Sequence, residues 1–142
     1  MRHSRAVVLA LAVVLLAACS DQSEAEAQEL ARQSCEYPAP ETRGFDPDTA
    51  DLGLLVELDQ VAQTRADLAA DAAARDDRWQ PLSDAATALA AYAGRLRELR
   101  SDGAEVSQEM TPMMWDQLKY ASDAFILECR AAMEPRSAAG RS

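Results

Sequence analysis

The chain has 142 residues, and its 24 Asp and Glu against 14 Lys and Arg give a formal net charge of −10. An acidic chain of this kind repels nucleic acid and anionic lipid headgroups, so neither is an expected partner. The length corresponds to about one domain, and abundant alanine together with an aromatic content of 5% favours an all-α fold in which helices pack through small side chains.

The N-terminus has the layout of an export signal. Arg2 and Arg5 precede an apolar run over residues 6–16, which is too short to span a ~30 Å hydrocarbon core as a helix. A basic start, a short apolar core and a small-residue end are typical of a secretory signal peptide. The run closes with the letters LAAC at Cys19, and residues 1–19 resemble a bacterial lipoprotein signal. The alternative is an ordinary secreted protein in which this cysteine carries no lipid.

The resemblance implies that residues 1–18 are removed and that Cys19 carries a lipid. More than one acyl chain on this cysteine would anchor the protein stably on the extracytoplasmic face of the cell membrane, or of the outer membrane if the cell has one. The mature chain keeps 12 Lys and Arg against 24 Asp and Glu, because the signal contains two arginines and no acidic residue.

The mature chain contains no histidine, because the one histidine, His3, lies in the signal. Histidine is the commonest general base and transition-metal ligand, and the Ser-His and Cys-His nucleophile pairs depend on it. We therefore expect no enzyme activity and no cofactor.

The remaining cysteines, Cys35 and Cys129, form a pair if Cys19 carries lipid, and an extracytoplasmic compartment favours their oxidation. A disulfide between them closes a loop of roughly 95 residues, for which the chain-entropy model gives a stabilisation of roughly 4–5 kcal/mol. Two free thiols acting in redox chemistry or metal binding are the alternative, but the chain has no C-x-x-C motif. We predict a structural disulfide.

Residues 19–45 are expected to form a lipid-anchored tether and an extended segment. Residues 20–34 are polar, and they either continue the tether or form a short helix. Pro38 and Pro40 bias the residues before them away from helix. The disulfide would staple this N-terminal segment to the rest of the fold.

The first of three predicted helices begins at Asp46-Pro47, because aspartate caps a helix N-terminus well and proline fits the first helical position. We expect this helix to end near Trp79, before Pro81. Its apolar residues recur at spacings of three and four, and they are Leu54, Leu55, Leu58, Val61, Ala62, Leu68, Ala69, Ala72 and Ala73.

The second predicted helix covers residues 81–100 and stops at Asp102-Gly103. The third begins at Thr111-Pro112 and closes before Pro135.

Short connections favour antiparallel neighbours, so residues 46–134 predict an up-down-up three-helix bundle. Cys129 then lies inward, near the end where the first helix finishes, and residues 36–46 must run down beside the bundle. We expect residues 135–142 to be a disordered tail.

Three thioethers in the stretch MTPMMW, those of Met110, Met113 and Met114, suggest a Cu(I) site, because Cu(I) favours soft sulfur ligands. However, Met113 and Met114 point in different directions around a helix, and Met110 precedes the helix cap. Filling of irregular space at one end of the bundle is the simpler interpretation.

Two residue pairs have similarly simple interpretations. Trp79 and Trp115 would suit an aromatic cage, but the predicted topology puts them at opposite ends of the bundle. Asp67 and Asp71 lie one turn apart, as paired metal ligands do, but Arg75 stands at ion-pair spacing from Asp71, so we expect a solvated face.

The stretch DPDTADLG over residues 46–53 lacks the alternating ligands and terminal glutamate of a calcium loop, so we expect it to cap the helix. Arg65 interrupts the Leu58-Val61-Leu68 stripe. It either binds an anion from within the core or extends outward to solvent, and we expect the second.

Two functions are compatible with these features. The first is a lipid-anchored, non-catalytic helical protein that contacts an unknown protein or another part of the cell envelope. The alternative is a ligand-binding lipoprotein that holds a metal ion such as Cu(I) or a small apolar molecule. The sequence favours the first and identifies neither partner nor ligand.

Overall fold

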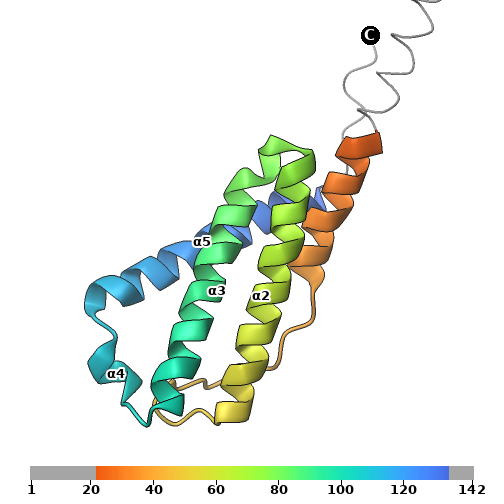
Figure 1. The fold of residues 1–142 in the computed structure, drawn as a ribbon. Coiled ribbons are helices and arrows are strands. Elements are labelled where there is room, and N and C mark those ends of the chain that lie inside the picture. Colours follow the sequence, from red (N-terminus) through yellow and green to blue (C-terminus); the bar gives the residue numbers. More distant parts are fainter. Residues whose placement is uncertain (1–21, 135–142) are drawn as a thin grey trace, which may run out of the picture.

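The computed structural model describes residues 22–134, which contain helices and no strand (Figure 1). The predicted signal, Cys19 and the predicted tail lie outside these residues. Within the described range, no helix is long and apolar enough to cross a membrane.

The elements follow one another with short connections. An N-terminal helix covers residues 22–36, and a connecting segment runs over residues 37–51. The remaining elements are α2 (Leu52–Arg75), the 3₁₀ helix η1 (Asp77–Trp79), α3 (Gln80–Ser101), α4 (Val106–Glu109) and α5 (Pro112–Met133).

Helices α2 and α3 form an antiparallel pair joined through η1, and α5 crosses behind this pair at an oblique angle (Figure 1). The N-terminal helix lies beside the upper part of α2, where "upper" denotes the end at Arg75. The fold is therefore all-helical as predicted. It adds an N-terminal helix to the three helices expected between residues 46 and 134. Residues 20–34 were expected to act mainly as a tether, but residues 22–34 are helical because Ala27 and Ala31 pack into the upper core.

The core has an upper and a lower part. The upper core is built mainly from alanines of the N-terminal helix, α2 and α3, with larger side chains between them, and it contains Ala27, Ala31, Ala66, Ala69, Ala72, Ala73, Trp79, Leu82, Ala85, Ala86, Ala90, Phe125 and Ala132. The lower core joins α2, α3 and α4 and contains Ala50, Leu55, Leu96, Leu99, Val106 and Met110. Small side chains let the upper helices approach closely, as the composition predicted.

The start of α2 was predicted wrongly. Asp46 and Pro47 begin one isolated turn, in which the amide N–H of Ala50 donates to the carbonyl of Asp46 at 2.8 Å. The chain then leaves helical geometry, and Asp51 caps α2 by accepting from the amide of Gly53 at 2.8 Å. The reason is that Ala50 is drawn into the lower core, which bends the chain between the two aspartates.

The end of α2 lies at Arg75, earlier than predicted, because Asp76 adopts an extended conformation (φ −154°, ψ 111°). The Asp76 carboxylate then accepts from the amide of Arg78 at 3.1 Å and so caps η1. This short 3₁₀ turn carries Trp79 into the upper core, where the side chain is 3% exposed.

The other helix ends match their predictions. Gly103 follows α3 with a positive φ of 75°, and the Ala104 amide donates to the Leu99 carbonyl at 2.9 Å. Together with the Gly103-to-Arg100 bond at 3.1 Å, this is a Schellman motif, which glycine forms without steric cost. Thr111 caps α5, with its hydroxyl accepting from the Met114 amide at 3.3 Å.

The sequence did not predict α4, because four residues are too few to show periodicity. Val106 anchors α4 in the lower core with no exposed surface. The Asp48 carboxylate accepts from the Ser107 amide at 3.0 Å and ties α4 to the connecting segment. Hydrogen bonds from the Ser107 side chain and amide lower the pKa of Asp48 below its usual value of 3.8.

The predicted disulfide between Cys35 and Cys129 is confirmed, and its Cα atoms lie 5.5 Å apart. It joins the last turn of the N-terminal helix to α5. Next to it, the Ser34 hydroxyl is fully buried and donates to the Arg65 carbonyl of α2 at 2.8 Å. The disulfide and this hydrogen bond thus connect the N-terminal helix to α5 and to α2 close to the same point along the bundle.

Replacement of Cys35 and Cys129 together by alanine should lower the free energy of unfolding by about 2–4 kcal/mol, because the unfolded chain gains the freedom of an open loop. Urea unfolding measures the change. Treatment of the unaltered protein with a reductant should shift its midpoint by the same amount and leave the double variant unaffected. An unaltered protein with the same midpoint in its oxidised and reduced forms would contradict the expectation.

Asp48→Asn keeps an oxygen that can accept from Ser107 but removes the charge. Because the folded-state pKa of Asp48 is lowered, its charge stabilises the fold above pH ~3.8 and this contribution disappears as the pH falls further. Thermal unfolding should find the variant less stable than the unaltered protein at pH 7, with a smaller difference in stability at pH 3. Asp67→Asn removes the same charge at an exposed position of α2 and serves as the control, with a stability at pH 7 close to that of the unaltered protein. If Asp48→Asn lowers the stability equally at both pH values, the charge of Asp48 does not stabilise the fold in the way proposed.

Candidate functional site

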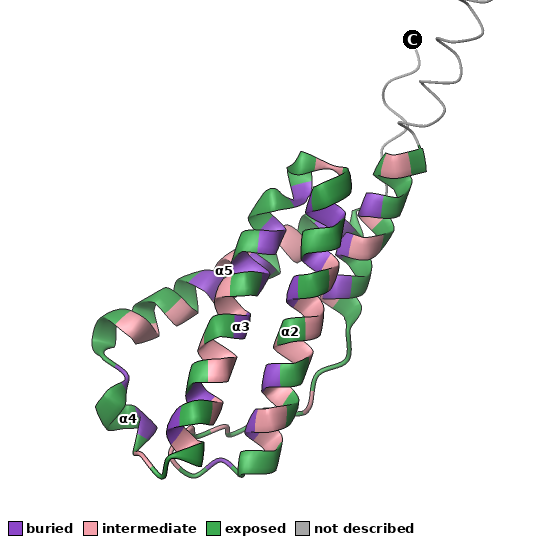
Figure 2. Ribbon diagram, viewed as in Figure 1, coloured by how far each residue is buried: buried purple, intermediate pink, exposed green. Residues whose placement is uncertain are grey.

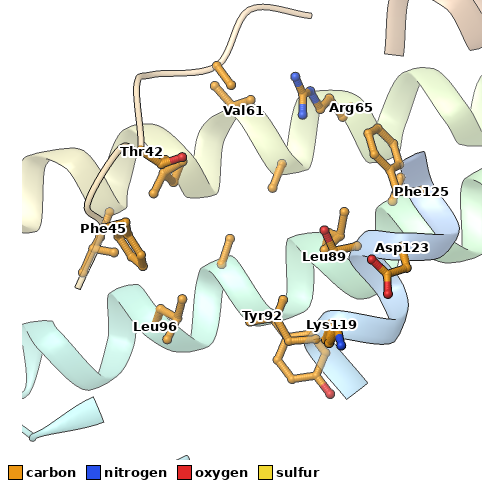
Figure 3. Close-up of a pocket in the computed structure, with 18 of the residues that line it drawn as sticks. Thr42, Phe45, Val61, Arg65, Leu89, Tyr92, Leu96, Lys119, Asp123 and Phe125 are labelled. Atoms are coloured by element: carbon orange, nitrogen blue, oxygen red, sulfur yellow. The ribbon is translucent and has the colours of Figure 1, made fainter. Parts of the chain in front are cut away.

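A groove of about 550 Å³ lies between α2, α3, α5 and the connecting segment (Figure 3). Most of its lining is apolar and comes from three helices. The main contributors are Leu58, Val61, Leu89, Leu96, Trp115 and Leu118. In Figure 3, Phe45 lies at one end of the groove, and Arg65 and Phe125 lie at the other.

The groove arises from the point where the N-terminal helix stops. Helical geometry ends at residue 36, before Pro38 and Pro40, so the non-helical connecting segment alone follows the lower half of α2. A single extended chain covers less surface than a helix, and Leu58 and Val61 therefore remain partly exposed. Figure 2 shows buried residues gathered at the upper end, where the N-terminal helix is present, and more partly buried residues along the lower halves of α2 and α3.

A second, shallower hollow adjoins the groove beside the disulfide. Both hollows share Arg65, Leu89, Ser122 and Phe125, so they form one continuous depression. The second hollow is bordered on α5 by Ile126 and Met133, whose side chains are each 49% exposed.

Arg65 lies where the two hollows meet, and its position differs from the expected one. Instead of extending freely into solvent, its Nη2 donates to the Tyr37 carbonyl at 2.6 Å and its guanidinium lies 5.6 Å from the centre of the Phe125 ring. The Nε atom is buried without an acceptor among the described residues. Burial lowers the pKa of Arg65, although an arginine in water titrates so high that the group stays charged.

The rim of the groove on α5 carries one charge of each sign, Lys119 and Asp123. Neither side chain forms an ion pair within residues 22–134. The neighbouring Tyr92 hydroxyl donates to Gln117 at 2.8 Å and fixes α3 against α5. The groove therefore has apolar walls, a half-buried cation at one end and a mixed-charge rim.

The three methionines do not share one environment. Met110 is 3% exposed in the lower core, and Met114 packs partly buried against the same core. Met113 is 65% exposed. This distribution does not support a three-sulfur Cu(I) site, and within residues 22–134 no group of three His, Cys, Asp or Glu could hold a metal ion.

The tryptophans lie apart, as predicted. Trp79 is in the upper core, whereas Trp115 packs against the lower core and lines the groove.

The two aspartates predicted to lie on a solvated face, Asp67 and Asp71, are both exposed. The expected ion pair between Asp71 and Arg75 is not formed. Arg75 instead donates to the Asp71 carbonyl at 2.8 Å and pairs with Glu26 of the N-terminal helix at 3.8 Å, because that helix supplies a carboxylate across the interface.

Sequence reasoning missed one charged core residue, Asp59, which is 8% exposed and pairs with Arg97 of α3 at 3.2 Å. The sequence did not predict the groove either. The one feature that pointed to it was Arg65, which interrupts the apolar stripe of α2.

Comparison of the chain with family models, curated proteins and solved structures found no match.

Proposed function

We propose that this chain is a lipid-anchored antiparallel helical bundle on the extracytoplasmic face of a membrane that binds a small apolar molecule in its groove. The observation that carries the proposal is the apolar groove of about 550 Å³. Small-molecule sites typically have volumes of roughly 300–1,000 Å³, apolar walls and a few polar groups that fix the orientation of the ligand.

Burial of a ligand is favoured by the partly exposed side chains of the groove. Leu58, Val61 and Leu89 are all partly buried. An apolar ligand would remove them from water and be removed from water itself, which is worth about 0.8 kcal/mol for each CH₂ group that becomes buried. The disulfide and the Ser34 bond hold the surrounding helices in place, so little ordering would be required on binding.

The proposed anchor is supported by the cysteines. The chain has three, and two of them are joined to each other. Cys19 is therefore the one cysteine left for a lipid, and it stands three residues before the first described residue of the N-terminal helix.

A second candidate function is the non-catalytic interaction role, and it is favoured by a separate surface. Met113, Tyr120 and Leu127 recur every seven residues on α5 and are 65%, 78% and 61% exposed. This spacing brings them close to one line along the helix, which a partner helix could cover. An unaltered protein whose groove takes up no apolar molecule would favour this role.

Cys19→Ala tests the anchor in the native host. We expect the variant to leave the membrane fraction and its mature form to lack the mass of the attached lipid, because acyl chains on this cysteine provide the binding to the bilayer. Cys35→Ala serves as a control, since it removes a cysteine but should leave the protein in the membrane fraction. A Cys19→Ala protein that stays membrane-bound with unchanged mass would mean that the anchor lies elsewhere.

The groove is tested with the chain from residue 20 onward, which includes every described residue, exported through an oxidising compartment. Titration with the apolar fluorophore N-phenyl-1-naphthylamine should give saturable binding. Val61→Asp places a carboxylate among the apolar walls and should weaken this binding by about tenfold or more. Val56→Asp makes the same change on α2 outside the groove, beside Leu52 and Arg97, and should bind as the unaltered protein does. Equal weakening by both variants would locate the probe elsewhere.

A further inference from the structure

The charges around the groove are unevenly placed. Its lining contains three charged side chains, of which Lys119 and Asp123 lie on the exposed rim and Arg65 lies half-buried at the end opposite Phe45 (Figure 3). Apart from Lys119 and Asp123 on the rim, the side chains that line the groove between Arg65 and Phe45 are uncharged. The groove thus has one cationic end and one apolar end.

Arg65 has no carboxylate partner within residues 22–134, although the chain has a large excess of acidic residues. Five other arginines form ion pairs within the described part of the chain, namely Arg32, Arg75, Arg78, Arg95 and Arg97. Arg65 instead uses one nitrogen for the Tyr37 carbonyl and faces the Phe125 ring. Its positive charge is partly removed from water and is not neutralised by another group of residues 22–134.

We infer that the groove binds an amphipathic anion, with a single carboxylate at Arg65 and an unbranched apolar tail that extends toward Phe45. This inference rests on the proposed binding function and specifies its ligand class. A guanidinium donates two parallel hydrogen bonds to a carboxylate, and such charge-assisted bonds are stronger where water is partly excluded. The neutral carbonyl that Arg65 now contacts leaves its charge available for this role.

The length and the rim of the groove fit a ligand with one charge. From Arg65 to Leu55, near the Phe45 end, α2 rises by about 15 Å, which gives the tail an apolar path along the helix. Lys119 and Asp123 on the α5 rim carry opposite charges that offset each other, so Arg65 supplies the net positive charge of the groove lining. A cationic ligand is disfavoured because its charge would lie beside Arg65 or among the apolar walls.

The experiment compares decanoate with decanol, which has the same tail and no charge, by isothermal titration calorimetry on the chain from residue 20 onward. The unaltered protein should bind decanoate on the order of tenfold more tightly than decanol. Arg65→Gln retains an N–H donor for the Tyr37 carbonyl but lacks the charge, and it should lose this preference while binding decanol as before. Arg95→Gln removes an arginine outside the groove and should keep the preference.

The outcomes separate this inference from the proposed function. Equal binding of decanoate and decanol by the unaltered protein overturns the anion inference and leaves an apolar site, and this comparison does not depend on any variant folding. If the Arg65→Gln protein still prefers decanoate to decanol, Arg65 does not bind the carboxylate and the inference is also overturned. Binding of neither molecule overturns the proposed function together with the inference. Arg65→Lys, which restores the charge, should recover part of the preference.

Discussion

The Cys35–Cys129 disulfide joins the N-terminal helix to α5 at the level of Arg65, and the groove depends on where this covalent link lies. Above it, three helices and α5 enclose a core of alanines around Trp79. Below it, the chain has left helical geometry, so the α2–α3 pair is bordered by α5 on one side and by an extended segment on the other. A single cross-link therefore separates a closed half of the bundle from an open half.

Local chemistry explains why the helices could be predicted and why some of their ends could not. The Thr111-Pro112 start and the Gly103 stop depend on residues that are adjacent in sequence, so the sequence was sufficient to place them. Asp46-Pro47 carries an equally good local signal, but Ala50 enters the lower core and interrupts the helix, which then starts again at Asp51. The cap between Asp51 and the Gly53 amide is local, but the burial of Ala50 in the lower core is a tertiary contact that a local window of sequence does not contain.

The candidate site was less predictable because it results from the arrangement of helices. The apolar stripe of α2 was visible, but whether Val61 meets a neighbouring helix or an open groove depends on the oblique path of α5 and on the end of the N-terminal helix. The sequence showed Arg65 as an exception in the stripe. It could not show that the Tyr37 carbonyl and the Phe125 ring would hold the guanidinium at the groove, because these residues lie 28 and 60 positions away.

The described chain begins at the upper end of the molecule and the groove lies further down α2, which bears on the source of a ligand if Cys19 is the anchor. Cys19 stands three positions before residue 22, a reach of about 11 Å at most. The first turns of the N-terminal helix contact the upper end of α2 through Arg75. Arg65 lies about 15 Å further down α2. Because the chain without its proposed signal has twice as many acidic as basic residues, an orientation flat against an anionic bilayer would be electrostatically unfavourable. The groove would then face the aqueous phase, and its ligand would enter as a dissolved molecule or after leaving the bilayer completely.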